Sequence, residues 1–223
     1  MKEKNVTFSD ILHDEEIRTY IKRADLSLER MGYTEHNLVH VGRVSRFAGD
    51  LLAQLGYDDH IVELARIAGY MHDIGNVVNR IDHAQSGAIM AFRILDKMGM
   101  PCADVAKIIA AIGNHDENTA WPVSDVAAAL IIADKSDVRR SRVRNINKES
   151  FDIHDRVNYA VTENDVSLSD DHTAVILSLT LDTEISPVLD YFEIFLNRMK
   201  LCQKAAAFLN LKFKLLINGA EIC

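Results

Sequence analysis

The stretch "AGYMHDIGN", residues 68–76, decides the fold, because it closes an apolar helical run with a histidine and an aspartate side by side. Four residues recur there at intervals of three or four positions and so share one face of a helix: Ile61, Leu64, Ala68 and His72. The pattern predicts a helix that ends near Ile74, with Gly75 as its left-handed terminator. His72 then points into the protein, and Asp73 stands next to it at the last turn.

Neighbouring segments repeat this arrangement, since each has an apolar stripe with a titratable residue at one end. Those residues are His36 and His40, His83, His115 and Asp134. Five successive helices are therefore expected to direct imidazoles or carboxylates toward the same core. An ionised aspartate buried there needs a cation, a hydrogen-bond network or a metal ion as its partner. Imidazoles and carboxylates gathered at one end of a helical bundle are ligands that divalent transition metals use.

The position of the doublet also indicates where such an ion would lie. Adjacent residues on a helix point about 100° apart, because the helix has about 3.6 residues per turn. His72 and Asp73 reach one ion only from the final turn, when the ion lies beyond the helix end. We therefore expect the metal site just past this helix.

Length and composition exclude several classes of protein. The 223 residues are 48% hydrophobic, which suffices for a large core and argues against a disordered or fibrous chain. The formal net charge of -8 disfavours general nucleic-acid binding and anionic membrane surfaces. Cys102, Cys202 and Cys223 form no CxxC pair, which is typical of a reduced, cytoplasmic protein. We also expect no membrane association, because the N-terminal residues lack a signal-peptide stretch and the run "VAAALIIA" is too short to span a bilayer.

Two units are predicted along the chain. Residues 1–140 have helical periodicity and form the expected metal-binding domain. A linker is expected near residues 140–155, where the sequence becomes polar and basic. Residues 150–223 alternate like strands in "VNYAVTENDVSLS", "AVILSLTLD" and "FKLLING", with a long helix over about 184–210. We expect a mainly α protein: a helical bundle, then a small α+β unit of antiparallel strands and one long helix that packs or forms a homodimer.

Three motifs resemble the HD superfamily of metal-dependent phosphohydrolases. "EHNLVHVGRV", "YMHDIGN" and "IIADKSD" are similar to its first histidine, its His-Asp doublet and its distal aspartate, and the resemblance covers roughly residues 30–140. It implies an HD-type helical bundle with a metal held by His40, His72, Asp73 and Asp134. His40 is preferred over His36 as the first ligand, because Arg43 and Val44 follow it as in the family pattern. His36 is then expected to contact the metal ligands or the substrate.

Two further motifs resemble the additional histidines of superfamily members that bind two metals or handle cyclic dinucleotides. They are "DHAQSGA" and "IGNHDE", and they contain His83 and His115. The chain departs from the family pattern in two places: "IGN" replaces the common "IGK", and Asn114 stands where a paired histidine is expected. The glycine-tyrosine-proline signature of cyclic-di-GMP phosphodiesterases is also absent after Glu117. One or two metal ions are both compatible with this set.

The expected chemistry is hydrolysis of a phosphate ester. A divalent cation held by two histidines and two aspartates lowers the pKa of a bound water and neutralises charge on phosphate. Asp73 is suited to orient or deprotonate the nucleophile, while His83 and His115 are suited to a second metal, to phosphate, or to protonating the leaving group. Lys135 and Arg139 are the expected cationic substrate contacts. Mixed nitrogen and oxygen ligands favour Mn, Fe, Co, Ni or Zn over magnesium.

The predicted function is thus a metal-dependent phosphohydrolase, a phosphomonoesterase or phosphodiesterase whose partner is a small phosphorylated substrate, with nucleotides among the candidates. One alternative is a non-catalytic regulatory module in which the metal holds a phosphorylated effector, a role to which Asn76 and Asn114 are suited. Another is a di-iron oxygenase, which would need His83 and His115 as ligands of a second iron.

Overall fold

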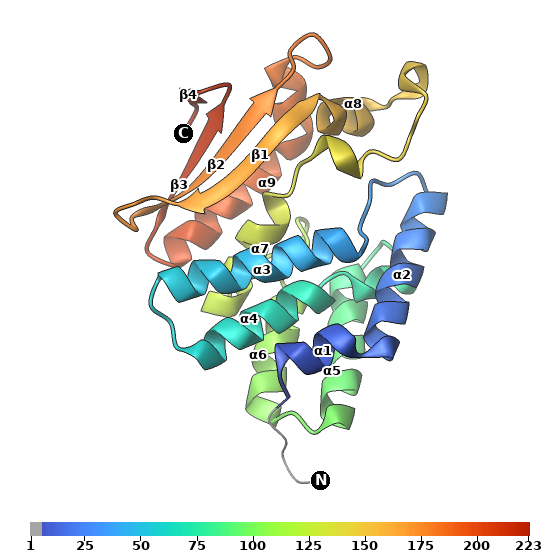
Figure 1. The fold of residues 1–223 in the computed structure, drawn as a ribbon, viewed down its shortest axis with the longest axis vertical. Coiled ribbons are helices and arrows are strands. Elements are labelled where there is room, and N and C mark those ends of the chain that lie inside the picture. The colour runs from blue at the N-terminus through green and yellow to red at the C-terminus, as the bar shows by residue number, and fades with distance from the viewer. Residues whose placement is uncertain (1–5) are drawn as a thin grey trace.

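The structure is a computed structural model, and it describes residues 6–223. The N-terminal part consists of helices joined by short turns (Figure 1). Their bounds are α1 Phe8–His13, α2 Glu15–Arg30, α3 Leu38–Gln54, α4 Asp59–Met71, the 3-10 helix η1 Ile74–Val77, α5 His83–Met98, α6 Cys102–Gly113 and α7 Asp125–Lys135. The mainly helical fold and the helical bundle predicted from the sequence are confirmed.

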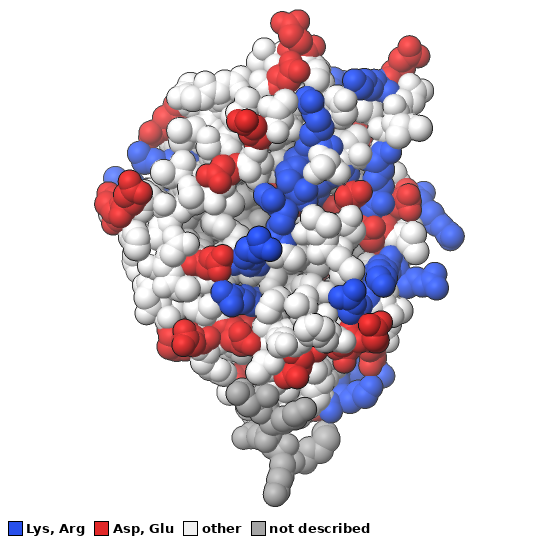
Figure 2. Space-filling model, viewed as in Figure 1, with Lys and Arg blue, Asp and Glu red and all other residues white. Residues whose placement is uncertain are grey.

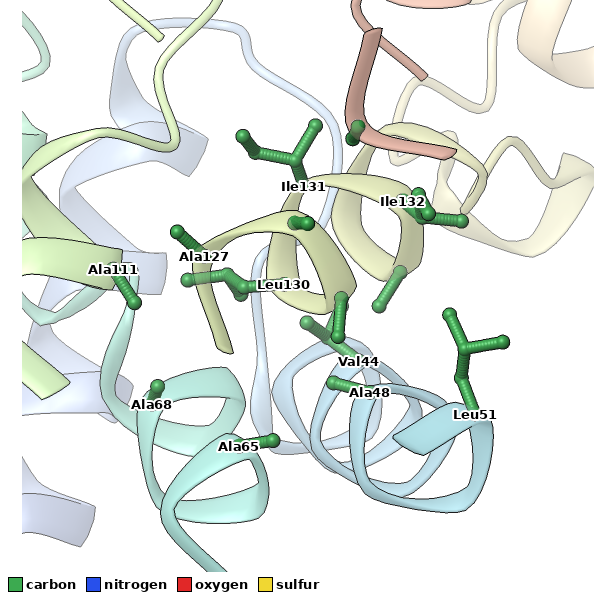
Figure 3. Packing of buried hydrophobic residues seen from close by; sticks show 14 of the residues in the cluster. Val44, Ala48, Leu51, Ala65, Ala68, Ala111, Ala127, Leu130, Ile131 and Ile132 are labelled. Atoms are coloured by element: carbon green, nitrogen blue, oxygen red, sulfur yellow. The ribbon is translucent and has the colours of Figure 1, made fainter. Parts of the chain in front are cut away.

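Helix α7 is the centre of the bundle. Every side chain from Val126 to Ala133 is buried, as expected for a helix that is apolar on all sides. It contacts α3, α4 and α6 in the bundle and α9 (Val188–Phe208) outside it. Figure 3 shows labelled side chains of α3, α4, α6 and α7 directed toward one another in this core. Because α7 is fixed from all sides, Asp134 in its last turn has a fixed position.

The segment after α7 is tied to the bundle. It contains the 3-10 helices η2 (Arg140–Arg142) and η3 (Lys148–Ser150). Arg142 is buried and donates from Nη1 to the Asp137 carbonyl at 2.6 Å and from Nε to the Glu35 carbonyl at 2.9 Å. These bonds hold the expected linker against the start of α3.

The C-terminal part is a four-stranded sheet, order β1-β2-β3-β4, packed with α8 and α9 against the bundle (Figure 1). The bounds are α8 Ile153–Ala160, β1 Val161–Leu168, β2 Ala174–Leu181, β3 Lys212–Ile217 and β4 Ala220–Glu221. One cluster of buried hydrophobic residues extends from the bundle into the sheet. The division of the chain into domains of residues 1–140 and 150–223 stays a prediction.

Two expectations for this part are wrong. The sheet is not wholly antiparallel, since β2 pairs with β3 in parallel; α9 lies between them in the chain, and a helical connection can return the chain to start a parallel strand. Residues 157–160 are also helical rather than extended, because the Asp152 side chain caps α8 by accepting from the Asp155 amide at 2.8 Å.

The turn after the His-Asp doublet also differs from expectation. Helix α4 ends at Met71, and Gly75 lies within η1 instead of closing α4 in a left-handed conformation. The physical need for glycine here is close approach: a Cβ on Gly75 would lie 2.0 Å from the His83 carbonyl oxygen and 2.4 Å from the Gly87 amide nitrogen. Contact between η1 and the start of α5 brings Asp73 close to His83.

Within residues 6–223, no helix combines the length and the apolar character needed to cross a bilayer. The cytoplasmic location expected from the sequence stays a prediction.

Replacing Gly75 by alanine is expected to lower the free energy of unfolding by about 1 to 3 kcal/mol, because the added methyl group must displace backbone atoms of α5. The matched control is Gly42→Ala, since a Cβ there meets no heavy atom within 4 Å. Urea unfolding curves of both variants measure the difference. Equal midpoints for the two variants would show that the close approach is not a constraint.

Candidate metal centre

Three helix ends bring the predicted ligands together. His40 lies in the first turn of α3, where the Asn37 side chain caps the helix. His72 caps the C-terminus of α4 with Asp73 next to it, and Asp134 lies in the last turn of α7. Nε2 of His40 is 3.4 Å from Oδ1 of Asp134 and 3.7 Å from Oδ2 of Asp73. Nε2 of His72 is 3.3 Å from the same Asp73 oxygen and 3.7 Å from the same Asp134 oxygen.

The hydrogen bonds of the two rings leave both Nε2 atoms as acceptors. Nδ1 of His72 donates to the Gly69 carbonyl at 2.8 Å, and Nδ1 of His40 donates to the Asp137 carboxylate at 2.7 Å. Both Nε2 atoms are buried, and neither has a hydrogen-bond partner among the described residues. Two lone pairs and two carboxylates therefore converge on one point, which costs free energy unless a cation lies there.

The spacing of these atoms fits a transition-metal ion. Metal-ligand bonds to histidine and carboxylate are about 2.0–2.2 Å long, so neighbouring ligand atoms of one ion lie about 3.0–3.5 Å apart. The observed separations of 3.3 to 3.7 Å are close to this range. Among residues 6–223, the groups able to hold a metal are His40, His72 and Asp134, and His72, Asp73 and His115.

His83 and His115 form a second pair beside the first. Their Nδ1 atoms donate to the carbonyls of Arg80 at 3.0 Å and Ile112 at 2.6 Å, and their Nε2 atoms lie 3.2 Å apart. Burial lowers the pKa of both rings, that of His83 to about 4, so both are neutral at neutral pH. Oδ1 of Asp73 lies 3.5 Å from His83 and 3.8 Å from His115. The two oxygens of Asp73 thus face different histidine pairs.

Asp73 and Asp134 are ionised, although Asp73 is buried and the side chain of Asp134 is only 12% exposed. Burial disfavours the charge of Asp73, but His72 and His115 hold its pKa well below the usual range. Burial also opposes ionisation of Asp134, but Lys135, with Nζ 2.6 Å from Oδ2, and His40 lower its pKa. Burial alone would lower the pKa of His72, yet Asp73 and Asp134 raise it to about 10. Without a metal, a proton on His72 takes the place of the cation.

Asp137 supports the centre from outside, and the sequence analysis did not single it out. Its carboxylate binds Nδ1 of His40, and Arg139 Nε donates to it at 2.6 Å. Such outer carboxylates fix the ring orientation and raise the basicity of a metal-binding histidine. Its position in the sequence could have indicated this role, because Asp137 ends the motif "IIADKSD" and lies about one helical turn after Asp134.

Of the three residues predicted to contact the substrate, Lys135 and His36 line the pocket at the metal centre, and Arg139 does not. Lys135 is buried and lines the pocket at the metal centre, paired with Asp134. His36 lines the same pocket; its Nδ1 donates to the Thr34 carbonyl at 2.7 Å, and burial lowers its pKa. Arg139 is not part of the pocket lining, because Asp137 and Ser141 hold its guanidinium.

Three other arginines line the pocket: Arg80, Arg142 and Arg198. Arg142 belongs to the basic run noted in the sequence, whereas Arg80 and Arg198 were missed. Arg198 lies on α9, far along the chain from every ligand motif, and no local pattern marks it. The overall charge of -8 therefore coexists with a cationic pocket. On the face drawn in Figure 2, Lys and Arg side chains run from the top centre down toward the middle, with acidic side chains on either side.

Asp137→Asn is expected to weaken divalent metal binding about 10- to 100-fold, because the neutral amide supports the His40 ring less well. Competition against a chromophoric chelator measures the dissociation constant. Asp50→Asn is the matched control, since Asp50 of α3 is partly exposed and pairs with Arg66 of α4 away from the metal centre. An unchanged metal affinity in Asp137→Asn would contradict this supporting role.

Metal-free protein is expected to lose stability as pH rises from about 6.5 toward 10. The pKa of His72 is about 10 in the folded state against 6.5 as its ordinary value, so this stabilisation is fully present below about pH 6.5 and declines progressively until about pH 10. A bound cation replaces the proton and removes this dependence. Urea midpoints of chelated and manganese-loaded protein at about pH 6 and about pH 9 test this; an equal decline in both forms would contradict it.

Comparison with known proteins agrees with this geometry. A model of the HD domain matches residues 37–156, more than half of the chain. "Uncharacterized protein MJ1020" of Methanocaldococcus jannaschii is 24% identical over 171 residues, which is 66% of this chain and 65% of that protein. "Ribonuclease Y" of Oceanobacillus iheyensis is 32% identical over 124 residues, 55% of this chain but only 22% of that protein.

One solved structure, titled as a "predicted HD superfamily hydrolase" from an uncultured Thermotogales bacterium, matches with a TM-score of 0.45 and 27% identity. It covers 57% of this chain and 69% of that one. The family match supports a metal-dependent hydrolase with a divalent metal at the buried His/Asp clusters. The matched residues include His40, His72, Asp73, His83, His115, Asp134 and Asp137, and this chain belongs to the HD-domain family.

Proposed function

We propose that this protein is a metal-dependent phosphohydrolase that acts on a small phosphorylated compound. The observation that carries the proposal is the pair of buried, unpartnered Nε2 atoms of His40 and His72, which converge with two carboxylates at a pocket lined by arginines. Acceptors that need a cation and donors that suit an anion thus lie side by side. A phosphate ester presented to a bound metal satisfies both.

The residues divide into two candidate ligand sets. His40, His72, Asp134 and Oδ2 of Asp73 would hold the first ion. His83, His115 and Oδ1 of Asp73 would hold a second ion. Nitrogen and oxygen donors together suit Mn, Fe, Co, Ni or Zn. A divalent cation bound there would lower the pKa of a bound water and neutralise negative charge on the phosphate.

The side chains of this protein would orient the reacting groups. Asn76 donates from Nδ2 to Oδ1 of Asp73 at 2.9 Å, which holds the carboxylate in place. Arg142 and Arg198 provide planar donors for phosphate oxygens. His83 and His115 carry their protons on Nδ1, so neither has a proton on Nε2 to give to a leaving group. We favour cation binding over acid catalysis for these two rings, because an Nε2 lone pair can bind a metal ion but cannot donate to an oxygen atom.

A phosphate ester is preferred to other hydrolysable bonds for two reasons. The pocket holds arginine, lysine and histidine side chains next to the candidate metal ligands. In addition, some relatives carry the name ribonuclease, which denotes cleavage of a phosphodiester. Those proteins are much longer than the matched region, so their activity is only a precedent for the bond type.

Elemental analysis of unchelated protein and a panel of phosphate esters, assayed with each of the five metals, test the proposal. Asp73→Asn is expected to reduce kcat at least about 100-fold, because one carboxylate serves both histidine pairs. Asp104→Asn is the control, since that carboxylate pairs with His60 outside the pocket. Metal-loaded protein that hydrolyses no member of a broad panel would refute the proposed function.

A further inference from the structure

The C-terminal part forms one wall of a large cleft over the metal centre. The cleft has a volume of about 700 Å³, and residues of α8 and α9 line it together with the loops that follow α2 and α6. His36, Arg80, Arg142 and Arg198 line both this cleft and the inner pocket that contains Asp73 and Asp134. The metal centre is therefore at the inner end of the cleft, and α9 is part of the route to it.

Arg198 is held in place at this junction. It forms an ion pair through Nε with Glu117, two residues after His115, and its guanidinium lies 4.6 Å from the centre of the Phe195 ring. The pair joins α9 to the bundle next to the second pair of histidines. Within residues 6–223, Nε is the only nitrogen of this guanidinium with a hydrogen-bond partner. Its two terminal nitrogens are therefore available for a phosphate.

The other arginines of the pocket are more committed. Arg142 is buried, and its Nε and Nη1 donate to the carbonyls of Glu35 and Asp137. Arg80 donates from Nη1 to Oδ1 of Asn76 at 3.3 Å and to Nε2 of His83 at 3.4 Å, so one of its terminal nitrogens is already used. Of the three arginines, Arg198 is therefore the one best placed to donate hydrogen bonds to a ligand in the cleft.

The rest of the cleft has the opposite charge. Five carboxylates line it: Asp82, Asp116, Glu117, Asp152 and Asp155. Carboxylates accept hydrogen bonds from hydroxyl and amino groups and repel further phosphates. A ligand that fits both parts has one phosphate at the inner end and hydrogen-bond donors along the rest of its length.

We propose that Arg198 binds the phosphate of the substrate and that the acidic wall restricts the site to compact phosphomonoesters with a hydroxyl- or amine-bearing body. A polynucleotide strand would place several phosphates against these carboxylates and is excluded. The proposal rests on the proposed function. It assigns the C-terminal part a role in substrate selection in addition to packing.

The first test measures binding of inorganic phosphate to manganese-loaded protein by calorimetry. Arg198→Gln is expected to weaken binding at least about tenfold, which is about 1.4 kcal/mol, with unchanged metal content. Arg156→Gln is the matched control, since Arg156 pairs with Asp190 and does not line the cleft. Glu117→Gln, which frees Arg198, is expected to bind phosphate as tightly as the wild type or more tightly. Phosphate affinity unchanged in a folded Arg198→Gln variant would overturn the role of Arg198.

The second test compares a nucleoside 5′-monophosphate with an oligoribonucleotide that has no terminal phosphate. The monoester is expected to have a kcat/KM at least about 100-fold higher, and Arg198→Gln is expected to raise its KM more than it lowers kcat. Equal hydrolysis of both substrates would overturn the substrate class. If phosphate binding depends on Arg198 but no ester is hydrolysed, the proposed function fails and the phosphate site stands.

Discussion

The two oxygens of one carboxylate organise this site. Asp73 directs Oδ2 toward His40 and His72 and Oδ1 toward His83 and His115, so a single side chain connects two histidine pairs. That arrangement requires Asp73 to lie between the end of α4 and the start of α5. The 3-10 helix η1 provides the position, and Gly75 permits the close contact with α5 that it needs.

The electrostatics of the site explain why it is costly to build and why the core must be rigid. Asp73 and Asp134 are ionised, and each of the four imidazoles holds a proton on Nδ1 that is bound by a carbonyl group or by Asp137. Each ring in this network has one fixed orientation, because its Nδ1 is bound and its Nε2 points inward. The uniformly apolar helix α7 supplies the fixed support on which Asp134 depends.

Helical periodicity was sufficient to predict the bundle and the convergence of its polar residues. A stripe of apolar side chains locates the inward face, so a histidine such as His72 or His115 at its end must point to the same core. Arg198 and Arg80 could not be predicted in this way. An arginine that lines a cleft belongs to no periodic pattern, and its distance from the metal ligands is set by tertiary packing. The parallel pairing of β2 with β3 is likewise a non-local choice, which the alternation of each strand does not specify.

The connection through α9 has a consequence for turnover. Its two ends continue into β2 and β3, which pair with each other, and its side packs on α7. A helix anchored in this way cannot swing as a hinged lid, so the guanidinium of Arg198 is preorganised before any ligand arrives. Under the proposed function, any adjustment to a ligand would then fall to side chains and to the loops that line the cleft after α2, η1 and α6.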